Sequence, residues 1–170
     1  MRGRVAQFYI FDALFAAFIF FIGITILASA GTSSVDKIQI HTYSIDALTV
    51  LTAQQVQDIV PLRDRSRYVY LRQDNTPAQQ IQRWAHVSDC DGCADNATVL
   101  IQRVISAIPQ EFSVNITLLN ATNDPLFTYG RASLLEGDHS IRVVSRRMVV
   151  SLNETGGILG PDTIEVTVSS

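Results

Sequence analysis

The residues from Phe8 to Ala30 form one apolar run in which Asp12 is the single ionisable side chain. At about 1.5 Å of rise per residue, a helix over this run is about 34 Å long, which exceeds the roughly 30 Å hydrocarbon core of a bilayer. The apolar residues cover all sides of such a helix rather than one stripe, so they suit lipid or a buried bundle. The run therefore predicts a membrane-crossing helix with a modest polar domain behind it.

The charges around this run predict its orientation. Arg2 and Arg4 precede it, and every acidic residue except Asp12 follows it, in residues 31–170. The positive-inside rule then favours a cytoplasmic N-terminus and places the rest of the chain outside the cell. A cleaved secretory signal peptide is the alternative, because Ala28-Ser29-Ala30 imitates its cleavage site, but the run is longer than the apolar region of such peptides.

Two features of residues 31–170 agree with an exported domain. Cys90 and Cys93 are the only cysteines, and a small disulfide across an Asp-Gly turn explains them most simply. The alternatives are half a zinc site, which lacks a second ligand pair at a fitting distance, and a thioredoxin-like redox pair, which lacks the strand before it. Four Asn-x-Ser/Thr sequons give candidate N-glycosylation sites at Asn96, Asn115, Asn120 and Asn153.

Asp12 has two interpretations, because an unpaired carboxylate at mid-helix in hydrocarbon costs about 2.5–3.5 kcal/mol. In the first, it lies at the cytoplasmic interface and complements the helix N-terminus. In the second, it finds a cationic partner inside a bundle of identical helices. An α-amino group exposed by proteolysis just upstream is such a partner.

The short basic leader from Met1 to Arg4, the Ala6-Gln7 pair and the apolar helix with one early acid resemble the archaeal type IV pilin-like proteins with a class III signal peptide. In that family a prepilin peptidase removes the leader, and the helix stays on the mature protein and packs in a filament core. The resemblance implies cleavage between Ala6 and Gln7, or after Gly3. It implies as partners the membrane before assembly, a pilus assembly platform and copies of the chain itself. The residues that it implies for the core helix are Asp12, Phe8, Tyr9, Phe11, Phe15 and Phe18. The best-known members carry Glu as the fifth mature residue, whereas here an Asp follows one place later.

The expected segments are a leader (1–6), a transmembrane or filament-core helix (7–30), an amphipathic helix (31–60) and an extracellular head (61–170). An apolar stripe predicts the amphipathic helix over 33–60, either continuous with the first helix or hinged at Gly31. Its members are Val35, Ile38, Ile45, Leu48, Leu51, Val56 and Ile59. The mixed charges of Arg63–Arg67 predict a solvated turn.

For the head, the patterns predict an α+β fold with helices followed by a roughly four-stranded antiparallel sheet, arranged as a meander. One helix is expected from Thr76, a suitable N-cap, to about Val87, and another from Ala94 to about Ile108. Alternating residues predict strands at 112–118, 126–132, 140–152 and 163–168. A bulge or a switch of face is expected near Arg146-Arg147, and Gly160-Pro161 is expected to bound a loop.

No residue pattern indicates catalysis. His41, His86 and His139 lack metal-ligand spacing, and no nucleophile-elbow, Walker or dinucleotide-binding motif occurs. We therefore expect no enzyme activity, cofactor or metal, and the acidic balance of residues 31–170 argues against nucleic acid. The leading hypothesis is a pilin of an extracellular filament. The alternatives are a single-pass membrane-anchored binding or adhesion protein, and a minor pilin or pseudopilin that initiates or tips a filament.

Overall fold

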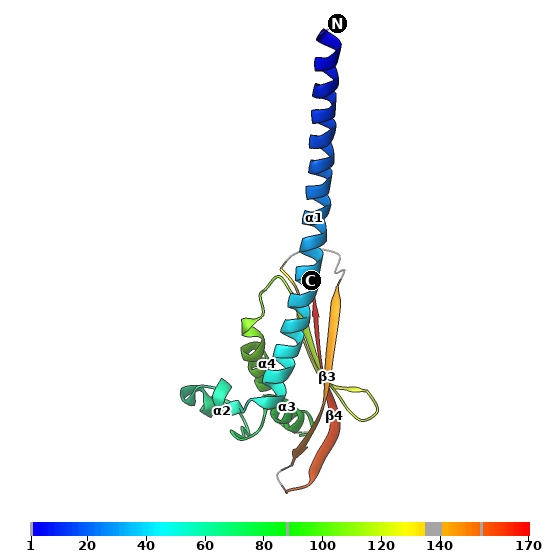
Figure 1. Ribbon diagram of the computed structural model, residues 1–170. Coiled ribbons are helices and arrows are strands. Elements are labelled where there is room, and N and C mark those ends of the chain that lie inside the picture. The colour runs from blue at the N-terminus through cyan, green and yellow to red at the C-terminus, as the bar shows by residue number, and fades with distance from the viewer. Residues whose placement is uncertain (1, 88, 135–140, 154) are drawn as a thin grey trace. The chain divides into compact units, whose positions relative to one another are not determined.

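The computed structural model describes all of the chain except residues 1, 88, 135–140 and 154, and in the first helix it leaves the side chains of residues 2–14 and 27–37 outside the described part. The chain divides into two compact units, Met1–Ile38 and Gln39–Ser170. The helix α1 (Arg2–Ala53) belongs to both (Figure 1). We call the unit Gln39–Ser170 the head.

The head has an α+β fold in which short helices precede a four-stranded antiparallel sheet. After α1 come α2 (Val56–Ile59), η1 (Leu62–Arg67), α3 (Pro77–Ala85), α4 (Cys93–Val104) and η2 (Ile105–Ala107). The strands are β1 (Ser113–Leu119), β2 (Pro125–Arg131), β3 (Arg142–Leu152) and β4 (Ile158–Ser169).

The order of the strands in the sheet is β2-β1-β4-β3, so the expected meander is wrong. β1–β2 and β3–β4 are antiparallel hairpins, but the two hairpins join through β1 and β4, which occupy the centre. Edge strands can carry more polar residues because one side of their ladder is open. The two central strands are accordingly the ones with the most regular apolar alternation, which includes Ile116 and Val166.

One face of the sheet forms the core of the head. Val114, Ile116 and Leu118 of β1 are buried, as are Ile164, Val166 and Val168 of β4. α3 packs against β3 and β4, and α4 packs against β2, so helices cover this face (Figure 1). The residues between them, such as Asn115 and Thr117, belong to the opposite face, as period-two alternation requires.

The head also includes the last part of α1, whose buried face differs from the predicted stripe. Ile40, Ser44, Ala47, Leu48 and Leu51 are buried, at the i, i+4, i+7, i+8 and i+11 spacing of one helical face. Ile38 and Ile45, which the stripe included, are 69% and 42% exposed. The prediction placed the buried face on the wrong side of the helix, because Leu48 and Leu51 fit both the predicted and the observed stripe. Ala47 and Ser44 complete the observed buried face, and neither is a large apolar residue.

Three boundaries also depart from the predictions. α1 ends at Ala53 rather than near residue 60, because Gln54-Gln55 interrupt it before α2 begins. The irregularity in the β3–β4 pairing lies between Val149 and Ser151, not at Arg146-Arg147. Gly160-Pro161 lies inside β4, with a cis peptide bond, and not in a loop.

The helix α3 confirms the prediction that Thr76 is its N-cap. Thr76 caps α3 by accepting a hydrogen bond from Gln79 N at 3.3 Å, and the Gln79 side chain accepts from Thr76 N at 3.0 Å, which makes a capping box. Trp84 of α3 stacks on Tyr68 and donates from Nε1 to Val69 O at 2.7 Å. The segment that contains Tyr68 is therefore a docked turn rather than a strand.

Candidate functional site

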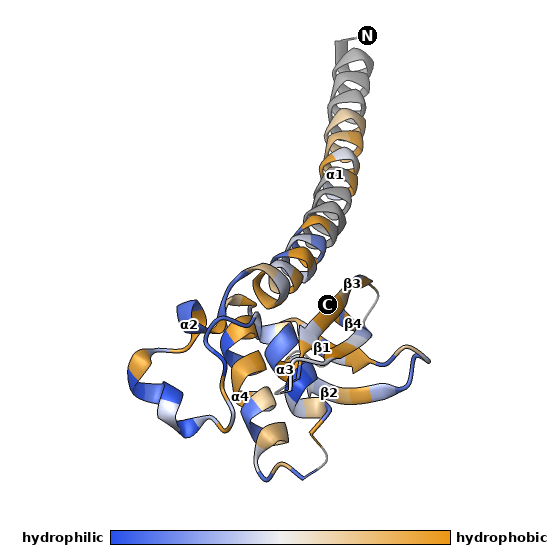
Figure 2. Ribbon diagram, turned by 90° about the horizontal axis from the view of Figure 1, so that it is seen from below, coloured by the Kyte–Doolittle hydropathy of each residue, from blue (hydrophilic) through white to orange (hydrophobic). Residues whose placement is uncertain are grey.

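The described part of α1 that precedes the head is an apolar segment, Phe15–Ile26, with all sides exposed. Phe15 and Phe21 are each 68% exposed, and Ile26 is 61% exposed. The other large apolar side chains of the segment that are exposed are Phe18, Ile19, Phe20, Ile22 and Ile24. Figure 2 colours this segment mainly in the apolar range, between two stretches drawn in grey. An apolar surface that surrounds a helix needs an apolar environment, which means lipid or other helices.

The polar groups of this segment are already satisfied. Thr25 is its only residue with a polar side chain, and its hydroxyl donates to Phe21 O within the same helix. The backbone groups are paired by helical hydrogen bonds. The segment therefore offers no unsatisfied donor to an apolar partner, which is the condition for stable contact with hydrocarbon or with packed side chains.

Only part of the predicted helix residues can be located. Phe15 and Phe18 belong to the apolar segment, whereas the side chains of Asp12, Phe8, Tyr9 and Phe11 lie outside the described residues. The predicted cleavage residues, Ala6 and Gln7, also lie there. Within the described residues, none of the helices combines the length and the apolar character that crossing a membrane requires.

The cysteines lie at disulfide distance. The Cα atoms of Cys90 and Cys93 are 5.5 Å apart, and Gly92 between them adopts a left-handed conformation with φ of +84°, immediately before α4. A pocket of about 210 Å³ adjoins this bridge, with Trp84 and Phe127 in its lining. The pair therefore closes the turn that starts α4.

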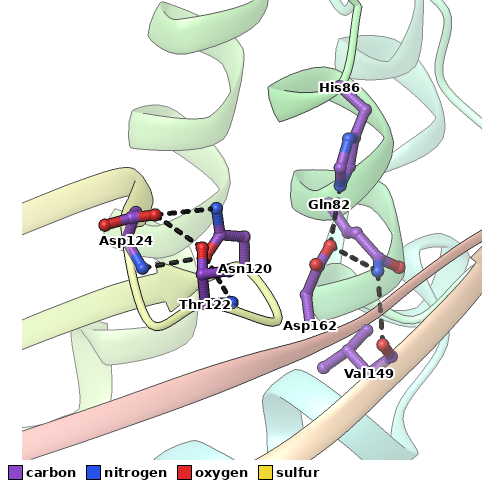
Figure 3. A network of polar contacts seen from close by, with 7 residues as sticks. All are labelled: Gln82, His86, Asn120, Thr122, Asp124, Val149 and Asp162. Atoms are coloured by element: carbon purple, nitrogen blue, oxygen red, sulfur yellow. Dashed lines mark hydrogen bonds and ion pairs between the residues drawn. The ribbon is translucent and has the colours of Figure 1, made fainter.

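A buried polar cluster joins α3 to β4, and sequence reasoning missed it. Asp162 is 3% exposed, and its Oδ2 accepts from Gln82 Nε2 at 2.7 Å and lies 2.7 Å from His86 Nε2 (Figure 3). Gln82 also donates to Val149 O at 3.2 Å, so the cluster spans three elements. His86 and Asp162 are 76 positions apart in the sequence, so no local motif predicts the pair.

The hydrogen bonds of the cluster link α3 to β3 and β4. A His–Asp pair works in catalysis when the histidine activates a nucleophile within hydrogen-bond reach. In the described part of the chain, the hydrogen-bond partner of the His86 ring is the carboxylate of Asp162. Among the same residues, no group of three His, Cys, Asp or Glu side chains is placed to hold a metal ion.

The Arg63–Arg67 segment lies in the 3-10 helix η1, which has no buried residue, so it is solvated as predicted but has regular structure and fixed contacts. Asp64 accepts from Arg103 of α4 at 2.8 Å, and Arg65 donates to the carbonyl oxygens of Gln57 and Val60. The hydrogen bond from Arg103 is the main reason why the pKa of the Asp64 carboxyl lies below its usual value. Burial acts in the opposite direction and is outweighed.

The four sequon asparagines occupy different kinds of backbone. Asn96 lies in α4 and Asn115 in β1, whereas Asn120 and Asn153 lie in the turns that close the β1–β2 and β3–β4 hairpins. The sequence alone did not distinguish the four sites.

Comparisons with protein-family models, with curated proteins and with solved structures found no match to this chain.

Proposed function

We propose that the chain is a structural subunit, a pilin, of an archaeal type IV pilus-like extracellular filament. The observation that carries this proposal is the apolar segment Phe15–Ile26, which is exposed on every side and attached to a separately folded α+β head. A soluble domain does not keep such a surface in water, because each exposed large apolar side chain forgoes about 1.5–3 kcal/mol of burial. The segment therefore needs lipid or copies of itself.

Both environments serve a filament subunit in turn. While the subunit waits in the membrane, residues 7–30 contact acyl chains as one long hydrophobic helix. On assembly, the same side chains contact those of neighbouring subunits, so the exchange loses little hydrophobic energy. Close packing of Phe15, Phe18 and Phe21 against other helices then adds dispersion and ring contacts.

Asp12 favours the assembled filament over the subunit in the membrane. In lipid its carboxylate has no partner, whereas in a bundle of processed subunits the new α-amino group of a neighbour is a cation of the right reach. A prepilin peptidase that cuts between Ala6 and Gln7 creates that group. The disulfide-distance pair Cys90–Cys93 supports an oxidising compartment for the head, as an extracellular filament requires.

The first test measures the intact mass and the N-terminal sequence of the native protein. A mass lower by the leader, six residues for cleavage after Ala6 or three for cleavage after Gly3, supports the pilin. An intact N-terminus supports the membrane-anchored adhesion protein instead. Loss of everything up to about Ala30 indicates a secreted protein and refutes the assembly proposal.

The second test substitutes Asp12 and follows filaments by electron microscopy of sheared surface material, with peptide identification. Asp12→Ala is expected to leave membrane insertion intact and to abolish most filaments, whereas the matched variant Asp12→Glu, which keeps the charge, retains them. Filaments of normal number and length in Asp12→Ala refute the proposed pairing. If the protein occurs only at filament ends or at low copy, the minor pilin is the correct form of the proposal.

A further inference from the structure

The four sequons differ in what the fold leaves available for glycan transfer. Transfer to asparagine requires that the side-chain nitrogen can be reached and that the hydroxyl of the Ser or Thr two residues later lies beside the asparagine carboxamide. It also requires backbone that can adapt to an enzyme without breaking the fold. The structure separates the four sites on these three criteria.

Asn96 fails on the first two criteria. Its Nδ2 atom is buried, and within the described residues it has no hydrogen-bond partner. The hydroxyl of Thr98 donates to Ala94 O at 3.0 Å, one helical turn earlier. The nitrogen of this sequon is therefore buried, and its hydroxyl is bound to the backbone of α4.

Asn115 fails on the third criterion. Its side chain is exposed, but it lies in β1, a central strand that pairs with β2 and β4 at once. In the sheet Asn115 is opposite Gly130 on one side and Thr167 on the other. To bend this sequon into an enzyme site would break the ladder on both sides.

Asn120 meets all three criteria. It starts the β1–β2 turn, and its Oδ1 accepts from Thr122 N at 2.9 Å, from Thr122 Oγ1 at 2.7 Å and from Asp124 N at 2.8 Å (Figure 3). The oxygen is thus held inside the turn. The nitrogen keeps one long contact, 3.4 Å to Asp124 Oδ2. The sequon hydroxyl lies against the carboxamide and also donates to Asp124 Oδ2 of the same turn, at 2.5 Å.

Asn153 repeats this geometry in the β3–β4 turn. Its Oδ1 accepts from Thr155 N at 3.0 Å, from Thr155 Oγ1 at 2.9 Å and from Gly157 N at 2.6 Å. The middle residue of the sequon, Glu154, lies outside the described residues. The same three donors on the same oxygen, at two turns unrelated in sequence, make one local arrangement.

The two turns lie at one end of the sheet. β1 and β3 both run antiparallel to β4, so β1 and β3 end at the same side. Along α1, Ser44 contacts Ser145 and Thr52 contacts Arg147, so α1 runs in the direction of β3 within the head. The turns are therefore at the end of the head toward Ala53, away from Gln39, where α1 enters it.

We propose that Asn120 and Asn153 are the N-glycan acceptors of the folded head and that Asn96 and Asn115 are not. The donor is an oligosaccharide linked through phosphate to a polyisoprenoid lipid. The asparagine Nδ2 forms a bond to the sugar C1, the bond from C1 to the phosphate oxygen breaks, the phosphate leaves with the electron pair, and one amide proton passes to a base of the transferase. The proposal rests on the extracellular position of the head that the proposed function gives it.

The first experiment determines site occupancy on the native protein by glycopeptide mass spectrometry. We expect glycan on the peptides of Asn120 and Asn153 and unmodified peptides at Asn96 and Asn115. Bare peptides at both turns, or glycan at Asn96 or Asn115, overturn the proposal. Glycan at one turn only overturns it for the other.

The second experiment asks whether the fold makes the selection. Full-length protein in detergent is offered to an oligosaccharyltransferase with lipid-linked oligosaccharide, once folded and once reduced and unfolded. Transfer to Asn96 is expected only after unfolding, with at least a tenfold difference in yield, whereas transfer to Asn120 occurs in both states. Equal transfer to Asn96 in the folded protein refutes selection by the fold.

Matched variants isolate the hydroxyl. Thr122→Ser is expected to retain transfer to Asn120 and Thr122→Ala to abolish it, with Asn153 unchanged in both as an internal control. Loss at both asparagines indicates a misfolded head and counts against the local mechanism. Filaments without glycan overturn this inference alone, whereas glycan at the turns of a protein that never assembles overturns the filament and leaves the inference intact.

Discussion

At the scale of single residues, Gly160 has the least room for an added Cβ among the glycines that the structure describes. Its φ is +96°, and an added Cβ would lie 2.6 Å from Gln82 Nε2 and 2.9 Å from Val149 O. Gly160→Ala is expected to lower the free energy of unfolding by about 1–3 kcal/mol, since it combines an unfavourable φ with a clash. Denaturant unfolding of the full-length protein in detergent, followed by Trp84 fluorescence, measures this.

Gly130 in β2 supplies the control for this substitution. No atom lies within 4 Å of a Cβ added there. Gly130→Ala is expected to change stability by less than about 0.5 kcal/mol, as surface substitutions usually do. If the two alanine variants unfold at the same denaturant concentration, the close approach around Gly160 is not what stabilises the β3–β4 hairpin.

The carboxylate of Asp162 is the second sensitive residue. Asp162→Ala removes the 2.7 Å acceptor of one N–H of the buried Gln82 Nε2, while the bond of Nε2 to Val149 O remains. One unpaired buried N–H costs about 1–3 kcal/mol. Asp162→Asn keeps an acceptor of the same shape and is expected to lose less. Thermal unfolding of both variants and of His86→Ala compares the contributions of these contacts to stability. An Asp162→Ala variant as stable as the wild type would show that the cluster does not stabilise the head.

At the scale of elements, the ion pair between η1 and α4 makes stability depend on acid. The pKa of Asp64 is below its ordinary value of 3.8 mainly because Arg103 donates a hydrogen bond to it. The unfolded chain therefore binds this proton first, so the contribution is complete above about pH 4 and is lost as the pH falls through the lower folded pKa.

Asp64→Asn is accordingly expected to lose less stability than the wild type when the pH falls from 5 to 2. Unfolding curves at several pH values measure the difference. Arg103→Gln removes the same ion pair. The stability of the double variant should therefore depend on pH no less than that of either single variant. Additive effects of the two substitutions would mean that Arg103 also shifts the titration of a group other than Asp64.

The cap of α3 gives a prediction of similar size. Thr76→Ala removes the acceptor for Gln79 N and is expected to cost about 1 kcal/mol, whereas Thr76→Ser keeps it. Chemical denaturation of the two variants measures the difference. Equal stability of both would place the start of α3 under the control of Pro77 and the packing of Trp84 alone.

The same elements show what the sequence can predict. Thr76 as the N-cap of α3 and the alternation of β1 are local patterns, and their predictions were confirmed. The helix predicted to about Ile108 ends at Val104, and the 3-10 helix η2 follows it. The order of the strands was missed because apolar alternation indicates which face of a strand is buried but not which strands lie beside it. The Gln82–Asp162 contact was missed for a related reason, since nothing near either residue specifies a partner 80 positions away.

At the scale of the molecule, the exposed apolar segment controls solubility. The full-length protein is expected to need detergent and to form large particles when detergent is removed, which size-exclusion chromatography with light scattering measures. Phe18→Ser with Phe21→Ser should reduce particle formation while the circular dichroism of the head is retained. Met148→Ser is the matched control, because Met148 is also 68% exposed but lies in the head. An equal reduction by this control would assign association to the sheet edge.

The order β2-β1-β4-β3 has a consequence for biosynthesis. β4 is the last of the four strands to leave the ribosome, yet it is the one that joins the two hairpins. Until it emerges, β1 has an open backbone edge, and the apolar side chains that it shares with β4 have nothing to pack on. Nascent heads that crowd together can pair through this edge, so a chaperone that holds the chain until translation ends would raise the yield of correctly closed sheets.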